Sequence, residues 1–224
     1  MCQYQANTED VWPGTGTYYP PTSGVSMEVY STSANDNATG GGIRTVTIYY
    51  LDTNYMEKEE TVTLNGLSAV TTTATNMFRI NAFRAATVGG LNAAAGDVSL
   101  RHFSGTTRYA QISTGNTRGR NSFYTVPANQ TLYMTSVTYS SSLAANKSVC
   151  LFTTRATYND KTKIRLNPLF YMPFHEAYVT DNTFYKPMEV PTRLPEKTDL
   201  KVSVKSSSAS ALCTTALRGW LESN

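Results

Sequence analysis

The two histidines, His102 and His175, are the side chains of this chain best suited to general-base chemistry. His102 lies in the strand-like run 100–103, where a half-buried sheet residue is the common role. His175 and Glu176 are neighbours on an extended segment, so their side chains point to opposite faces and form no dyad. Neither a Gly-x-Ser-x-Gly elbow nor a phosphate-binding glycine loop accompanies them. The sequence therefore predicts a protein that is not an enzyme.

Carboxylates are the next candidates, because their oxygens suit Ca²⁺. Four of them crowd one turn: Asp52, Glu57, Glu59 and Glu60. Their spacing matches no known calcium loop, so we interpret them as a solvated acidic turn. Asp36 and Asp97 lie in glycine-rich loops, where aspartate commonly caps turns. We therefore expect no metal and no cofactor.

The cysteines are Cys2, Cys150 and Cys213, an odd number whose spacing matches no metal motif. Cys150 and Cys213 lie in strand-like surroundings, so we expect buried free thiols. A bridge between these two residues stays open as an alternative.

Binding to other proteins is the chemistry that the aromatic and arginine residues favour. The first 24 residues form an extended N-terminal arm rich in proline, and its rings would be exposed to water if it were free. We expect Trp12, Tyr18 and Tyr19 to dock on a neighbouring subunit, with packing on their own domain as the alternative. Arg118 and Arg120, in the long polar stretch 104–122, could form paired hydrogen bonds with carboxylates of a partner.

Carbohydrate binding is an alternative, since exposed aromatic rings can serve as platforms for sugars. Tyr109, Tyr158 and Tyr171 flank predicted loops and would be the platform residues. The alternative role for them is ordinary packing, because tyrosine is a favoured strand residue.

Composition limits the other classes of partner. The net charge of +3 is too small to indicate nucleic-acid binding, although residues 98–159 contain arginine and lysine but no acid. No signal peptide and no membrane-spanning run is expected, so the chain would be made in a cytosol. Only 16% of the residues are charged, which fits burial within an assembly and an ordinary threonine-rich β protein equally well.

The elements that must position these residues are short strands. In Ile43–Leu51, Val46, Ile48 and Tyr50 alternate with polar residues and so share one face of a strand. Similar runs recur along the chain, and no helical periodicity is sustained. This pattern predicts an all-β protein with an antiparallel sandwich or barrel.

We expect one domain over residues 25–224, following the arm of residues 1–24, and find no linker. Pro187, Pro191 and Pro195 frame an edge-like segment. The runs Asp199–Lys205 and Leu212–Leu221 look like a closing pair of strands.

Residues 124–135, 193–202 and 219–221, together with Ile43–Leu51 and 59–66, resemble β-sandwich virion proteins of tailed bacteriophages. The resemblance implies a jelly-roll-like fold and a structural part of a particle, with capsid decoration or cement as the first expectation. A tail or fibre component, or a host-surface-binding module, is the alternative. The implied partners are the major capsid protein or neighbouring copies in a homo-oligomer, and the implied location is the virion. Membrane and nucleic acid are not among the expected partners.

Overall fold

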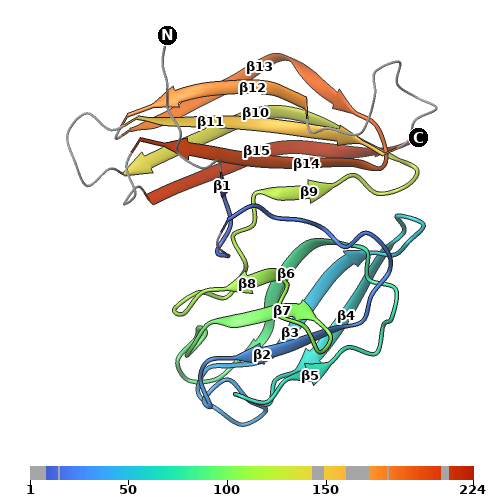
Figure 1. The fold of residues 1–224 in the computed structure, drawn as a ribbon, viewed down its shortest axis with the longest axis vertical. Helices are drawn as coiled ribbons and strands as arrows, with labels where there is room; N and C mark the ends of the chain where they lie inside the picture. Colours follow the sequence, from blue (N-terminus) through green and yellow to red (C-terminus); the bar gives the residue numbers. More distant parts are fainter. Residues whose placement is uncertain (1–8, 15, 143–148, 160–171, 181, 208–211) are drawn as a thin grey trace. The chain divides into compact units, whose positions relative to one another are not determined.

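The computed structural model describes residues 9–14, 16–142, 149–159, 172–180, 182–207 and 212–224 (Figure 1). Every regular element in these residues is a β-strand, and every strand pairing is antiparallel. The all-β fold predicted from the alternating pattern is therefore confirmed.

The chain divides into two compact units, which corrects the expected single domain over residues 25–224. The N-terminal unit consists of Trp12–Gly14 and Tyr18–Asn121, and the C-terminal unit of Ser122–Asn224 with the earlier residues 9–11 and 16–17. Each unit has its own pair of sheets. The boundary at Ser122 falls at the end of the polar stretch 104–122, whose sequence predicts a loop within one domain.

The N-terminal unit contains a four-stranded sheet of order β5-β2-β7-β8 and a three-stranded sheet of order β4-β3-β6. Their bounds are β2 Met27–Ser31, β3 Ile43–Leu51, β4 Glu57–Thr63, β5 Val70–Thr71, β6 Arg79–Val88, β7 Val98–His102 and β8 Arg108–Ile112. Val46, Ile48 and Tyr50 are all buried, as their alternation in β3 predicts.

The stretch 104–122 is less irregular than its composition indicates. It contains β8, which pairs with β7, and its later part follows the edge of β6. There Ala85 donates to the carbonyl of Thr117 and Gly119 to that of Phe83. These main-chain hydrogen bonds hold the segment that carries the two predicted interface arginines.

The C-terminal unit is a β-sandwich of two sheets. One has the order β1-β14-β11-β12, with β9 also on β14, and the other the order β13-β10-β15. Their bounds are β1 Glu9–Asp10, β9 Phe123–Thr125, β10 Gln130–Ser142, β11 Cys150–Tyr158, β12 Met172–Val179, β13 Thr183–Leu194, β14 Thr198–Ser206 and β15 Leu212–Ser223. The jelly-roll connectivity stays a prediction.

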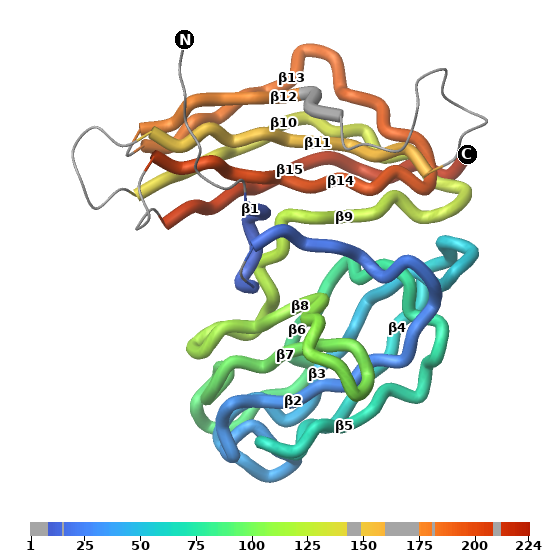
Figure 2. The backbone as a smooth tube through the Cα atoms, viewed as in Figure 1, coloured from blue at the N-terminus to red at the C-terminus, as the bar shows by residue number. Residues whose placement is uncertain are grey.

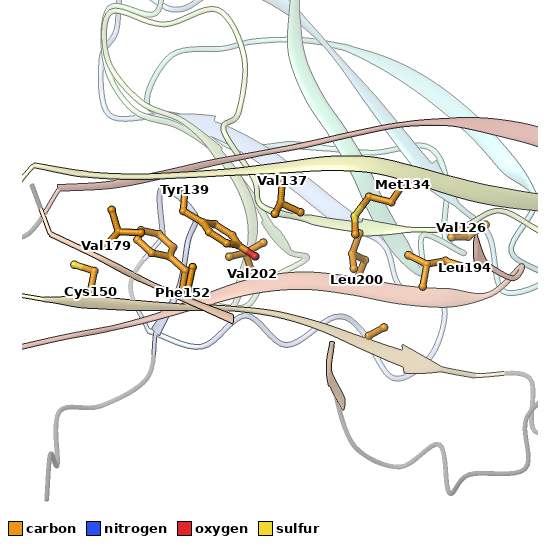
Figure 3. Packing of buried hydrophobic residues seen from close by; sticks show 12 residues of the cluster. Val126, Met134, Val137, Tyr139, Cys150, Phe152, Val179, Leu194, Leu200 and Val202 are labelled. Atoms are coloured by element: carbon orange, nitrogen blue, oxygen red, sulfur yellow. The ribbon is translucent and has the colours of Figure 1, made fainter. Parts of the chain in front are cut away.

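The core of this sandwich is formed by apolar side chains from the facing sides of both sheets (Figure 3). Tyr139 of β10 stacks on Phe152 of β11, with ring centroids 5.0 Å apart, and both are fully buried. Met134 and Val137 of β10 meet Leu200 and Val202 of β14 in the same cluster. Burial of this apolar surface holds the two sheets together.

The expected pairing of the last two strands with each other is wrong. β14 pairs with β11, whereas β15 pairs with β10 in the opposite sheet. Their alternation was recognised correctly, but alternation within a strand carries no information about its partner.

The N-terminal segment is partly built into the sandwich, which corrects the expectation of an arm separate from the domain. Glu9–Asp10 form β1, the dark blue start of the coloured tube in Figure 2, and pair with Val204 and Ser203 of β14. The Asp10 carboxylate accepts hydrogen bonds from Lys201 Nζ at 2.9 Å and from Ser203 Oγ at 2.7 Å. Residues 1–8 and 15 of the predicted arm lie outside the described residues.

Candidate interaction surface

The two histidines lie in different units and in unlike surroundings. His102 Nδ1 donates a hydrogen bond to the carbonyl oxygen of Phe103 at 2.8 Å. His175 Nδ1 is 2.9 Å from the hydroxyl of Tyr139, which is also hydrogen-bonded to Thr154. The neighbouring Glu176 instead accepts a hydrogen bond from Thr153. His175 therefore serves the packing of the sandwich.

The surroundings of His175 disfavour its charged form. Burial, and to a smaller extent the positive charge of Lys186, lower the pKa of His175 from its ordinary value of 6.5. Burial also raises the pKa of Tyr139 to about 12, so this hydroxyl stays neutral throughout the physiological range. The pair is thus a neutral hydrogen-bonded contact at neutral pH.

A change of pH should reveal this contact. Because the pKa of His175 is lower in the folded state, the unfolded chain binds the proton more readily, and stability falls as the pH drops below 6.5. His175→Gln, which retains hydrogen-bonding groups near Tyr139, should show a smaller loss. Urea midpoints measured at several pH values between neutrality and mild acid test this. Identical pH dependence in the two proteins would contradict the assignment.

Two aspartates that we considered as metal ligands, Asp97 and Asp52, instead accept hydrogen bonds that stabilise turns. Asp97 accepts hydrogen bonds from Thr114 and Gln111, and Asp52 from the backbone of Asn54 and Met56. Within the described ranges, no three His, Cys, Asp or Glu side chains are arranged to hold a metal ion.

Cys150 and Cys213 are free thiols whose sulfur atoms lie 3.6 Å apart between the two sheets of the sandwich. Burial, with the adjacent Cys150 thiol, raises the pKa of Cys213 to about 12. Cys213 therefore remains protonated at neutral pH, as a thiol shielded from water does. Cys2 lies outside the described residues.

The predicted aromatic interface residues do not form one exposed group. Tyr18 is buried and contacts the half-buried Trp12, with ring centroids 5.5 Å apart in an edge-to-face arrangement. The expectation that Tyr18 docks on another subunit is therefore wrong, because its ring already packs within its own chain. Tyr19 is 71% exposed and remains available.

The predicted arginines are both exposed on the N-terminal unit. Arg118 lies directly opposite Arg84 across a β-bridge, so the two side chains leave the backbone on the same side. Arg84 is also exposed, and its guanidinium lies 4.3 Å from the ring centre of Tyr49. Two neighbouring positive charges of this kind favour an anionic partner.

Sequence reasoning missed a set of apolar side chains on one sheet of the C-terminal unit, which we name the β13–β15 surface. It comprises the exposed Tyr185, Val190, Leu212 and Trp220 and the half-buried Tyr133. Strand pairing places Tyr133, Tyr185, Leu212 and Trp220 on the face of β13-β10-β15 opposite the core. Tyr133 stacks on Trp220 at 5.4 Å, and the indole donates to Glu222. Leu212 and Val190 are 74% and 79% exposed.

The sequence signal for this surface was weak. Pro187 and Pro191 did mark β13 as an edge-like segment, and β13 is indeed the edge of its sheet. In β15, however, Leu212 and Trp220 alternate with Cys213, Leu217 and Leu221. Because both faces are apolar, the pattern does not say which one is buried.

The predicted sugar platform is not formed as expected. Tyr109 is buried, Tyr158 is half-buried, and Tyr171 lies outside the described residues. A ring that is buried within its own unit offers no face to a sugar, so the prediction for Tyr109 is wrong.

Comparison with known proteins identifies no relative of this chain. No protein-family model, no curated protein and no solved structure matches this chain. The residues that the structure describes include no helix of the length and apolarity needed to span a membrane.

Proposed function

We propose that this chain is a structural component of a virus particle of the tailed-bacteriophage type, and that it acts by binding other subunits. Capsid decoration or cement is the role we favour, and a tail or fibre position is the alternative. The observation that carries the proposal is the β13–β15 surface, where large apolar side chains remain in contact with water. Aromatic side chains such as Tyr185 and Trp220 are enriched at protein–protein interfaces.

Two further features support a binding role. Arg118 and Arg120 are exposed, and the main-chain hydrogen bonds beside them limit the conformational freedom that binding would remove. Tyr19 adds an exposed ring on the same unit. We expect the arginines to meet carboxylates of the major capsid protein or of a neighbouring copy.

Incorporation into particles tests this function. Phage particles made with the full-length chain should contain it after gradient purification, as detected by quantitative mass spectrometry. Tyr185→Ser combined with Val190→Ser should lower its copy number several-fold, because it removes apolar contact area from the β13–β15 surface. Tyr178→Ser is the matched control, since Tyr178 is 74% exposed but belongs to β12 in the other sheet.

A chain that never co-purifies with particles would overturn the proposal. So would equal incorporation of the control and the double variant, because the β13–β15 surface would then not carry binding.

Carbohydrate binding is the second candidate, and it rests on the stacked pair of Tyr133 and Trp220. The indole is 44% exposed and has Glu222 beside it, which is the combination of ring face and polar group that sugar sites use. A glycan array probed with the full chain, and with Trp220→Ala and Tyr178→Ala, tests it. An array without signal removes this candidate.

A further inference from the structure

The free edge of β15 has the features of a strand that pairs with another strand. β15 forms a continuous ladder with β10 along Leu212–Ser223 on one side. On its other side, no strand among the described residues pairs with it. An edge of twelve residues leaves a row of backbone N–H and C=O groups available for a further strand.

β15 also lacks the protection that other edges of this protein have. β13, the opposite edge of the same sheet, contains Lys186, Pro187 and Pro191, and proline cannot donate to a ladder. The edge strand β4 of the N-terminal unit carries four consecutive charged residues, Glu57–Glu60. β15 contains no proline and no lysine, and the bulge in its pairing lies on β10 at Thr135.

The last part of β15 stands clear of the core. From Leu212 to Leu217 exposed and half-buried residues alternate, whereas every residue from Arg218 to Ser223 is exposed. The end of the strand is held in place, since Asn224 bonds to the backbone of Asn129 and to the hydroxyl of Thr131. An approaching strand would therefore meet an ordered edge whose two faces are both accessible.

We propose that two copies of this chain associate by antiparallel pairing of their β15 edges around a two-fold axis at Trp220. Arg218, Trp220 and Glu222 project from one face of β15, because they alternate along it. In this register Arg218 of each copy lies opposite Glu222 of the other, and the two tryptophans face each other. The Arg–Glu pair thus occurs twice, as a two-fold interface requires.

The charges select this register over its neighbours. Moving the axis to Arg218 would place the two arginines opposite each other, and like charges at directly opposed positions are destabilising. With the axis at Trp220, each tryptophan also keeps its stacking on Tyr133, so four aromatic rings form a continuous row. A second copy is therefore the occupant that fits the charge pattern of this edge.

Sedimentation equilibrium of the full chain tests the proposal. The wild-type protein should reach twice the mass of the chain as its concentration rises. Arg218→Glu and Glu222→Arg should each weaken the dimer by about tenfold, because each change creates two repulsive pairs. The double variant Arg218→Glu/Glu222→Arg should restore it, since the pairs are re-formed with exchanged partners. Arg193→Glu is the control, because Arg193 is exposed on β13 beside Tyr133 but lies away from the β15 edge.

A chain that stays monomeric at its highest soluble concentration would overturn this dimer, as would a dimer that the two charge reversals leave intact. Failure of the double variant to restore association would reject the register. These outcomes are measured in solution and do not depend on the proposed place in a virus particle.

Discussion

Replacing Asp10 by alanine should lower the free energy of unfolding of the C-terminal unit by about 3–5 kcal/mol. The side chains of Asp10 and Lys201 are 2% and 7% exposed and form an ion pair at 2.9 Å. Without the carboxylate, the buried ammonium group of Lys201 would lose this ion pair, and the hydroxyl of Ser203 would lose its hydrogen bond to Asp10. This change removes one side chain from a strand of two residues, yet it should affect the whole sandwich.

The measurement has to report on one unit at a time. The chain has two tryptophans, and Trp220 belongs to the C-terminal unit while Trp12 clusters with the N-terminal unit. Urea unfolding of Asp10→Ala in a Trp12→Phe background, followed by the fluorescence of Trp220, therefore isolates the sandwich.

The matched control removes both charges of this pair. Asp10→Asn/Lys201→Met eliminates the buried ammonium and keeps an oxygen that can accept from Ser203, so it should recover most of the lost stability. Equal stability of Asp10→Ala and the wild-type protein would show that Glu9–Asp10 do not belong to the folded sandwich in solution.

Asp36→Ala should have an effect of similar size on the N-terminal unit. The carboxylate of Asp36 is fully buried and accepts four hydrogen bonds: from Ser31 Oγ at 2.6 Å and from the backbone N–H groups of Ile43, Ala95 and Gly96 at 2.7–2.9 Å. Each donor left without a partner costs about 1–3 kcal/mol, so a total loss on the order of 4 kcal/mol is expected after partial relaxation. Together these bonds join the end of β2, the start of β3 and the loop before β7.

Trp12 fluorescence in a Trp220→Phe background reports on this unit. Asp97→Ala is the matched control, because Asp97 also caps turns of the N-terminal unit but is partly exposed to water. Its loss should cost only about 1 kcal/mol, since water can replace the missing acceptor. Comparable losses in the two variants would contradict the special role of Asp36.

The sequence predicts a structural feature of this chain where residues close together along the backbone determine it. The strand Ile43–Leu51 was predicted with its bounds and its buried face, because side-chain alternation is a property of the extended backbone itself. The turn-capping role of Asp36 was also predictable from the glycine-rich loop around it, but its burial was not. A Cβ at Gly42 would lie 2.1 Å from Asp36 Oδ1, so Gly42 provides space for a contact that is invisible in the sequence.

The predicted interface residues show the same difference between what the local sequence determines and what tertiary contacts determine. The exposure of Arg118 and Arg120 was expected from a polar stretch and is confirmed, while their proposed partners stay a prediction. Tyr18 was assigned to an interface because an aromatic residue on an extended arm has no local partner, yet the folded chain supplies one in Trp12. Hydrophobicity shows that a ring must be covered, but it does not identify what covers it.

The backbone periodicity of this chain dictates that it forms strands and that these build antiparallel sheets, because every polar N–H and C=O group needs a partner and an alternating strand has one apolar face. Its division into two units, the pairing of β15 with β10, and the ion pair between residues 191 positions apart arise only from folding in three dimensions. Non-local contacts are selected by the simultaneous fit of many side chains in a core, and no local stretch of residues contains that information.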